Sequence, residues 1–311
     1  MPSNPIIPDP PPPPTAFIHE DLCPQTSDGM RLLGLYMKNC PEWVIADQAA
    51  FTINAASVPL YDTLGPDSVG YVINQTELAT VVCGPQVRAC CGWIDRLRRG
   101  LGLNIRIPSN LRNLCTIHPS NHKQELENLV AAAPKCPSLK AAILTTPALS
   151  DHHRHLARKG GGCVGSRLQA SRPPLNPRHA LGLTRHHPTP VPPWSTGLKL
   201  YSILDLERLG FRYPQPHSPP DPQDVATFSY TSGTTGGPKG ALLTHSNFLC
   251  VYAAGKALEV ENFPDDVHFS YLPLPHVFER VMLLAVLGNG AAMGFWQGSP
   301  EKLVEDLQVG R

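Results

Sequence analysis

The stretch Tyr-Thr-Ser-Gly-Thr-Thr-Gly-Gly-Pro-Lys-Gly at residues 230–240 gathers hydroxyls, glycines and one lysine into a single short loop. Glycines allow backbone N–H groups to approach an anion and point toward it. The Ser and Thr hydroxyls add donors, and Lys239 adds a mobile positive charge for phosphate oxygens. Residues 225–230, just before the loop, are rich in β-branched and aromatic side chains and predict a strand. This combination predicts a polyphosphate site.

The loop differs from a Walker A sequence, in which Gly-Lys is followed directly by Ser or Thr. Here Pro238 precedes Lys239 and Gly240 follows it. A flexible Gly/Ser/Thr linker is the alternative interpretation. The embedded Pro-Lys-Gly, and the position of the loop between two apolar strand-like runs, favour the phosphate site.

The loop resembles the signature of the adenylate-forming superfamily, Tyr-Thr-Ser-Gly-Thr-Thr-Gly-x-Pro-Lys-Gly, and matches it at every fixed position with Gly237 at the variable one. Three further stretches, at residues 34–43, 58–65 and 272–280, are similar to eukaryotic-type long-chain fatty acyl-CoA synthetases. Tyr-Asp-Thr-Leu-Gly at 61–65 and His-x-Phe-Glu-Arg at 276–280 favour that branch over luciferases and peptide-synthetase modules.

The resemblance implies ATP-dependent ligation of a long-chain fatty acid to coenzyme A through an acyl-adenylate, with Mg²⁺ on the phosphates. Such a reaction needs no protein nucleophile, because the protein positions two anions and neutralises charge on the transferring phosphoryl group. We therefore assign no catalytic residue. The resemblance implies that Mg²⁺ is held partly by water and that its acidic protein ligand belongs to a later motif of the family, so no residue here is assigned to the metal. The residues expected to bind the ATP phosphates are Thr231, Ser232, Gly233, Thr234, Thr235, Gly236 and Lys239.

His276 lies in a stretch that lines the acyl pocket in the resembling family, which predicts the same role here. The alternative is a histidine at a helix start that bonds to the backbone. Glu279 and Arg280 are adjacent opposite charges on a predicted helix, a pattern that favours a structural role over catalysis. The histidines near 152–155 and 186–187 lack Cys, Asp or Glu partners at ligand spacing beyond Asp151, so no metal site is predicted there.

The order of elements predicts an α/β fold. Strands are expected at 31–37, 55–60 and 80–83, with helices at 41–54 and 67–75 between them, and this order favours a mostly parallel sheet flanked by helices. We predict further helices at 246–258, 276–287 and from Ser299 to 307, and strands at 268–272 and 291–295. The helix at 276–287 is apolar nearly all round, which predicts that it is buried.

Composition restricts the function further. The net charge of +1 gives no reason to expect a nucleic-acid partner. The nine cysteines include no C-x-x-C pair, which favours reduced intracellular thiols over disulfides or zinc. No secretory signal is visible, and the strongly apolar run at 281–287 is too short to span a bilayer, so membrane contact would be peripheral. The resemblance suggests the endoplasmic reticulum or peroxisome.

We divide the chain into five parts. Residues 1–25 form a Pro-rich end predicted to be disordered, with consecutive prolines at 10–14. Residues 26–83 are the first part of the AMP-binding domain, and 199–311 are the part with the phosphate loop. Residues 84–198 form an irregular insert with a family-like patch at 123–144. No Asp or Glu occurs from 152 to 200. The family resemblance is lost at 84–121 and at 149–196 and returns after each, so these two stretches are either translated non-coding sequence or a basic insertion loop.

The motifs expected later in the family are absent from the sequence: those for adenine, ribose and the hinge, and the C-terminal domain. We therefore expect a partial N-terminal domain with little synthetase activity of its own. Two alternatives remain open. One is a non-catalytic homologue or interaction protein that docks partners through its Pro-rich segments, and the other is an adenylating enzyme for aryl or amino acids.

Overall fold

The computed structural model describes residues 16–61, 67–84, 123–146, 198–231, 237–258, 263–296, 301 and 303–309. In these residues one sheet has the strand order β5-β4-β3-β1-β2-β6-β7. All neighbouring strands in it are parallel except β6 and β7, which are antiparallel at one edge. Its strands are β1 (Arg31–Tyr36), β2 (Ala55–Pro59), β3 (Thr80–Cys83), β4 (Ala141–Leu144), β5 (Lys199–Ser202), β6 (Val225–Thr231) and β7 (Lys239–Thr244). The predicted α/β fold with a mostly parallel sheet is confirmed.

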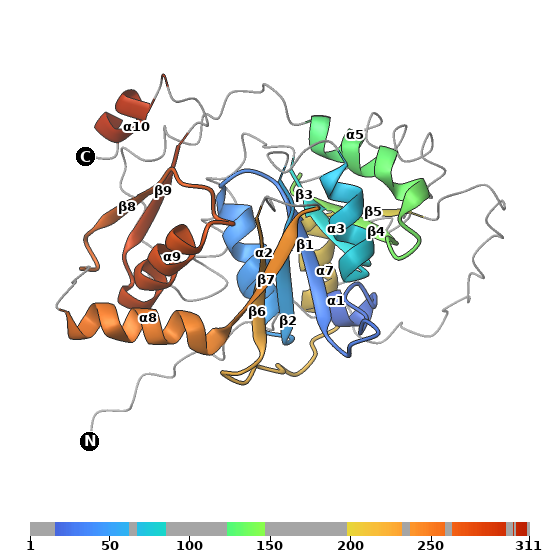
Figure 1. Cartoon of the computed structure of the whole chain (residues 1–311), viewed down its shortest axis with the longest axis horizontal. Coiled ribbons are helices and arrows are strands. Elements are labelled where there is room, and N and C mark those ends of the chain that lie inside the picture. Colours follow the sequence, from blue (N-terminus) through green and yellow to red (C-terminus); the bar gives the residue numbers. More distant parts are fainter. Residues whose placement is uncertain are drawn as a thin grey trace, which may run out of the picture.

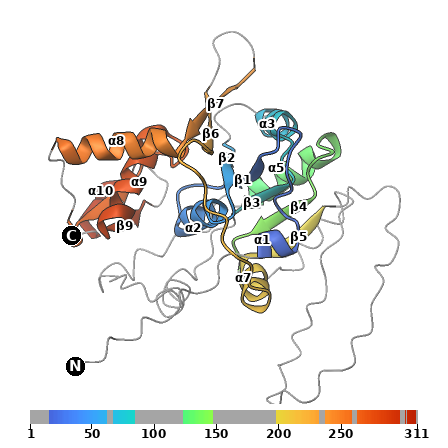
Figure 2. The same ribbon diagram turned by 90° about the horizontal axis from the view of Figure 1, so that it is seen from below.

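Helices cover both faces of this sheet (Figure 2). Side chains alternate along a strand, so β1 contributes Leu32 and Tyr36 to one apolar cluster and Leu33 and Leu35 to the other. The first cluster packs against α3 (Ser68–Thr76) and α5 (Lys123–Ala132), which continues as a 3₁₀ turn at Ala133–Lys135. The second packs against α1 (Ala16–His19), α2 (Pro41–Phe51) and α7 (Ile203–Arg212).

A smaller parallel sheet begins after β7. It pairs β8 (Val267–Ser270) with β9 (Ala292–Phe295), and α9 (Val277–Asn289) connects the two strands as a βαβ unit. The helix α8 (His245–Ala257) runs from the end of β7 along α9 toward this unit (Figure 1). A last helix, α10 (Leu303–Val309), follows. The smaller unit is therefore joined to the main sheet through the hairpin strand β7 and α8.

Local sequence sets where several helices begin and end. Pro41 occupies the first turn of α2, where its missing N–H leaves no hydrogen bond unmade. Thr244 and Asn247 form a reciprocal capping box at the start of α8. Gly290 ends α9 with a φ of 70°, a left-handed conformation that glycine adopts without a Cβ penalty. These residues set where α2 and α8 begin and where α9 ends.

Several expectations need correction. Residues 16–25 were predicted to be disordered, but Phe17 and Leu22 are buried in the second cluster because the apolar side chains that follow the prolines pack on the sheet. The strand β4 from the family-like patch lies between β3 and β5, so this patch is part of the sheet. The helix α9 is buried on one face only, and Val277, Phe278 and Leu287 are about half exposed.

Element ends shift by a few residues. The helix α2 ends at Phe51 because the chain turns through Asn54, which has a φ of 50°. The predicted cap at Ser299 lies outside the described residues, as do the Pro-rich segment 1–15 and most of the two irregular stretches, 85–122 and 147–197. Their predicted character, and the interaction-protein alternative that depends on the prolines, stay predictions.

The described cysteines are free thiols. Cys23, Cys40, Cys83 and Cys136 are buried, and Cys250 is exposed. Burial raises the pKa of the Cys23 thiol to about 12, so this thiol stays protonated near neutral pH. Among the helices of the described ranges, none combines the length and apolar character needed to cross a bilayer.

Candidate functional site

The predicted phosphate loop connects the two strands of the β6–β7 hairpin. In the antiparallel ladder Thr231 pairs with Lys239, and Tyr230 pairs with Gly240. Both Thr231 and Lys239 are exposed, at the positions where the chain leaves β6 and enters β7. A hydroxyl and an ammonium group are thus brought together at the base of the loop, which suits an anion. The predicted phosphate residues between them, Ser232, Gly233, Thr234, Thr235 and Gly236, lie outside the described residues.

Tyr230 is held from several sides. Its hydroxyl donates to Oε1 of Gln75 on α3 at 2.9 Å, and its carbonyl oxygen accepts a hydrogen bond from the hydroxyl of Tyr61. A Cβ on Gly240 would lie 2.9 Å from the Tyr230 ring, so the cross-strand partner can only be a residue without a side chain unless the ring moves. Burial raises the pKa of Tyr230 to about 12, and the nearby Tyr71 adds to this effect. Tyr230 therefore remains a neutral donor.

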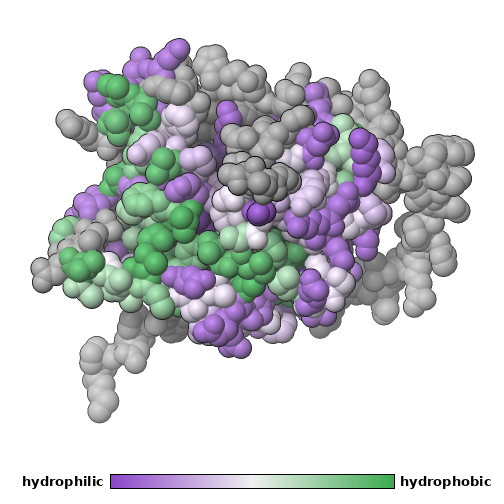
Figure 3. All heavy atoms as spheres, in the orientation of Figure 1, coloured by the Kyte–Doolittle hydropathy of each residue, from purple (hydrophilic) through white to green (hydrophobic). Residues whose placement is uncertain are grey.

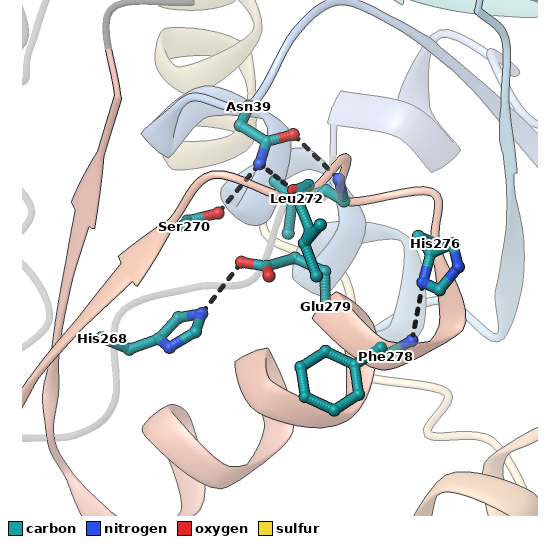
Figure 4. A network of polar contacts seen from close by, with 8 residues as sticks. Asn39, His268, Ser270, Leu272, His276, Phe278 and Glu279 are labelled. Carbon is teal, nitrogen blue, oxygen red and sulfur yellow. Dashed lines mark hydrogen bonds and ion pairs between the residues drawn. The ribbon is translucent and has the colours of Figure 1, made fainter. Parts of the chain in front are cut away.

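His276 occupies the N-cap position of α9. Its Nδ1 accepts a hydrogen bond from the backbone N–H of Phe278 at 3.2 Å, and the side chain is exposed (Figure 4). In the neutral ring the proton then sits on Nε2. This geometry is the backbone-bonded arrangement that the sequence left open as an alternative. The acyl-pocket role of His276 stays a prediction.

Glu279 and Arg280, the next two charged residues, both point into the interior. Glu279 lies 3.0 Å from Nε2 of His268 on β8. Arg280 lies 2.6 Å from Asp47 on α2, as an ion pair, and its second Nη donates to the hydroxyl of Ser57 on β2 at 3.3 Å. These contacts offset part of the cost of burying the charges, although Oε2 of Glu279 has no hydrogen-bond partner among the described residues. This placement favours a role in the packing of α9. The expected structural role fits this placement.

A polar network around Asn39 joins the loop before α2 to the end of β8 in the small sheet and to the segment that follows it. The amide of Asn39 donates to the hydroxyl of Ser270 at 2.9 Å and to the carbonyl of Leu272 at 2.6 Å (Figure 4). Its oxygen accepts from the N–H of Leu274 at 2.8 Å. A single buried side chain therefore fixes the turn between β8 and α9, which carries His276.

Two surface features lie away from the hairpin. A depression of about 250 Å³ lies beside β8 and α9 and contains none of the predicted site residues; it is lined by Asp266, Val267, His268, Phe269, Val286 and Ala291. Apolar side chains gather at the lower left of Figure 3, where Figure 1 places α8 and α9. Leu249, Val251 and Leu258 are exposed in or next to α8.

In the part of the chain that the structure describes, no group of three or more His, Cys, Asp or Glu could hold a metal ion.

Sequence reasoning missed the residues that contact the loop's base from outside it. Tyr61, Tyr71 and Gln75 come from the segment after β2 and from α3, far from the loop in sequence. Tyr61 belongs to the Tyr-Asp-Thr-Leu-Gly stretch, whose resemblance to a known family was the available signal. For Tyr71 and Gln75 the signal was weaker: they are exposed residues four apart on one helix.

The arrangement is similar to solved adenylate-forming proteins. The adenylation domain of a carboxylate reductase from Mycobacterium chelonae matches with a TM-score of 0.59 at 15% identity, over 94% of this chain and 34% of that one. A long-chain-fatty-acid-CoA ligase from Archaeoglobus fulgidus matches with a TM-score of 0.54 at 14% identity, over 94% of this chain and 40% of that one. At such identities the likeness shows the fold.

Sequence relatives are closer. Long chain acyl-CoA synthetase 7, peroxisomal, from Arabidopsis thaliana is 33% identical over 277 residues, which are 89% of this chain and 29% of that protein. Long-chain-fatty-acid–CoA ligase 5 from Rattus norvegicus is 30% identical over 282 residues, 90% of this chain and 31% of that protein. The chain thus spans less than a third of the length of these relatives.

A match to a family model shows the family, and the matched residues include both strands of the hairpin, β6 and β7, and the start of α9. Residues 27–310 match the family described as AMP-binding enzyme. Because this match covers most of the chain, the chain belongs to the AMP-binding enzyme family.

Proposed function

We propose that this chain supplies the ATP phosphate-binding part of an enzyme that ligates a long-chain fatty acid to coenzyme A through an acyl-adenylate. The AMP-binding family match supports the nucleotide, and the names of the sequence relatives support the fatty acid and coenzyme A. The observation that carries the proposal is the cross-strand pair of Thr231 and Lys239 at the base of the Gly- and Thr-rich loop.

In this proposal the chain's own residues bind and orient the triphosphate. The Lys239 ammonium and the Thr231 hydroxyl contact phosphate oxygens, and the loop residues Ser232, Gly233, Thr234, Thr235 and Gly236 add hydroxyl and backbone donors. Mg²⁺ would be held by the phosphates and by water rather than by a protein cage, and it would neutralise charge on the phosphates. His276 is assigned to the acyl pocket near the fatty carboxylate.

A binding measurement tests the nucleotide part. Isothermal titration of the chain with Mg-ATP is expected to give binding that Lys239→Ala weakens about ten- to a hundredfold, since a charge-assisted hydrogen bond contributes roughly 1.5–3 kcal/mol. Lys199→Ala is the matched control, because Lys199 is also exposed and also begins an edge strand, at the opposite side of the sheet. Equal affinity for Lys239→Ala and the unaltered chain would reject the phosphate role.

The acid substrate is tested separately. Exchange of labelled pyrophosphate into ATP requires adenylate formation. In a chain completed with the later family motifs, we expect exchange to depend on a long-chain fatty acid such as palmitate, whereas the present chain should show little exchange by itself. Exchange driven by an aryl or amino acid, and not by palmitate, would identify a different adenylating enzyme. Absence of exchange with any acid, in a completed chain that binds Mg-ATP, would support the non-catalytic alternative.

We place the protein on the endoplasmic reticulum or peroxisomal membrane through peripheral contact, without a nucleic-acid partner. The name of the Arabidopsis relative supports the peroxisome. Subcellular fractionation with a high-salt and carbonate wash tests this assignment: release of the protein by the wash supports peripheral contact, and recovery in the cytosolic fraction alone contradicts it.

A further inference from the structure

The helix α3 contacts the strand β6 and Gly237, the loop residue two positions before the start of β7. A Cβ built on Gly237 would lie 3.3 Å from Cζ and 3.5 Å from the hydroxyl oxygen of Tyr71, so the Tyr71 ring lies directly against the Gly237 backbone. One turn later on α3, Gln75 accepts the hydrogen bond of the Tyr230 hydroxyl at 2.9 Å. Residues four apart share one helix face, so a single face of α3 reaches Gly237 before β7 and Tyr230 in β6.

These contacts fix the positions of the two residues that lie near the predicted phosphate ligands Thr231 and Lys239. Tyr230 is fixed at its hydroxyl by Gln75 and at its carbonyl by Tyr61. The following residue, Thr231, therefore leaves β6 in a set direction. On the other side of the loop, Gly237 lies two residues before Lys239, the first residue of β7, and the Tyr71 ring lies against it. Both predicted ligands at the loop base are thus adjacent to a residue that α3 holds.

The fold itself does not account for these two side chains. The apolar cluster on this face of the sheet uses Val69, Val72 and Ile73 of α3, and Tyr71 is outside both clusters. Tyr71 is 42% exposed, and Gln75 is exposed as well. Neither side chain belongs to the buried clusters, whereas the contacts of both with residues 230 and 237 use a ring and a hydrogen-bond acceptor.

We propose that Tyr71 and Gln75 are positioning residues that hold the base of the β6–β7 hairpin in the geometry that binds the triphosphate. The proposal rests on the function proposed above. Tyr71 acts through Gly237 and Gln75 acts through Tyr230, so neither residue needs to touch the nucleotide.

The first test compares Mg-ATP affinity among variants of α3. Tyr71→Ala removes the ring and is expected to weaken binding roughly three- to tenfold, while Tyr71→Phe retains the ring and restores most of the affinity. Gln75→Leu is expected to weaken binding a few-fold because the Tyr230 hydroxyl loses its acceptor. Asn74→Ala is the control on the same helix, since its amide bonds to the Lys135 carbonyl on another segment, and it should bind Mg-ATP like the unaltered chain.

The second test needs no nucleotide. Hydrogen–deuterium exchange of peptides that cover β6 and β7 is expected to become faster in Tyr71→Ala and Gln75→Leu and to stay unchanged in Asn74→Ala. Peptides from β1 serve as the internal reference, because a variant that unfolds globally speeds exchange there too. Exchange confined to the hairpin is a change that general destabilisation does not produce.

The outcomes separate the two proposals. Failure of the unaltered chain to bind Mg-ATP rejects the proposed function, and the exchange measurement then still decides whether α3 holds the hairpin. If the unaltered chain binds Mg-ATP and Tyr71→Ala binds it equally well, only the positioning role is overturned. A loss of affinity as large in Asn74→Ala as in Tyr71→Ala also overturns it, because the effect would then belong to α3 as a whole.

Discussion

The guanidinium of Arg280 and the carboxylate of Asp47 lie 2.6 Å apart between α9 and α2, and neither side chain is more than 4% exposed. Arg280 also donates to the Ser57 hydroxyl, and its guanidinium carbon lies 5.0 Å from the centre of the Trp43 ring. Ser57 in turn donates to the Thr227 hydroxyl on β6 at 3.0 Å. This arginine therefore connects the small βαβ unit to the main sheet close to the strand that leads into the phosphate loop.

Removing one partner of this ion pair should destabilise the fold strongly. Arg280→Met leaves the buried Asp47 charge without its cation, and we expect a loss of about 3–5 kcal/mol in the free energy of unfolding by urea. The double variant Arg280→Met with Asp47→Leu should recover most of that loss, because a buried pair replaced by apolar side chains is often neutral. Arg208→Met is the control: its contact with Asp205 is 3.5 Å long and largely exposed, so a change below about 0.5 kcal/mol is expected. A small effect of Arg280→Met would show that the pair contributes little.

Asn39→Ala should loosen the turn before α9. The variant removes three hydrogen bonds, to Ser270, Leu272 and Leu274, and leaves the N–H of the fully buried Leu274 without an acceptor. We expect a loss of about 2–4 kcal/mol in the free energy of unfolding. Asn74→Ala, which removes an exposed amide contact, should change it by less than about 0.5 kcal/mol. Equal stability of the two variants would contradict the importance of the Asn39 network.

The order of elements could be predicted from the sequence because apolar runs of strand length alternate with helical segments, and this depends only on local pattern. The hairpin, too, follows from two strand-like runs on either side of the Gly-rich loop. The partners of Glu279 and Arg280 could not be predicted, because Asp47 is 233 positions away from Arg280 and only the folded chain brings them together. The same holds for Tyr71 and Gln75, whose targets are set by packing between elements.

Composition misled the prediction at the N-terminal end. The proline content of residues 1–25 predicted disorder for the whole segment, but Phe17 and Leu22 are buried against the sheet. At the N-terminal end a few side chains thus contradict the average character of their segment. At His276, the sequence left a backbone-bonded histidine at the helix start open as an alternative, and the structure shows His276 as the N-cap of α9, although Ser, Thr, Asp and Asn are the preferred N-cap residues.

Glu77 should make stability depend on pH in the acid range. Its carboxylate accepts hydrogen bonds from the backbone N–H and the hydroxyl of Ser27, at 2.9 and 2.8 Å, and these bonds hold its pKa below the usual 4.5. A carboxyl with a lowered folded-state pKa stabilises the fold above the unfolded-state pKa, and this contribution disappears as the pH falls through the folded-state value. Glu77→Gln should therefore be less stable than the unaltered chain at pH 7, and the gap should close below pH 4.5. Urea unfolding from pH 7 to 3 measures it, and a gap independent of pH would contradict the assignment.

Gly240 and Gly255 provide a matched pair of substitutions with opposite expected signs. A Cβ at Gly240 would meet the Tyr230 ring at 2.9 Å, so Gly240→Ala forces the ring to move and should lower the free energy of unfolding by about 1–3 kcal/mol. Gly255 lies within α8 with no atom within 4 Å of a built Cβ, so Gly255→Ala should raise it by about 0.5–1 kcal/mol.

The two substitutions also separate stability from the site. Moving the Tyr230 ring strains its bond to Gln75, so Gly240→Ala should weaken Mg-ATP binding in titrations where Gly255→Ala does not. In a double-mutant cycle, Tyr230→Leu removes the ring that the new methyl group meets, and the combined loss of stability should be smaller than the sum of the single losses. Additive losses would mean that the methyl group at position 240 acts on something other than the Tyr230 ring. The contact between these two cross-strand residues would then not be what fixes the base of the phosphate loop.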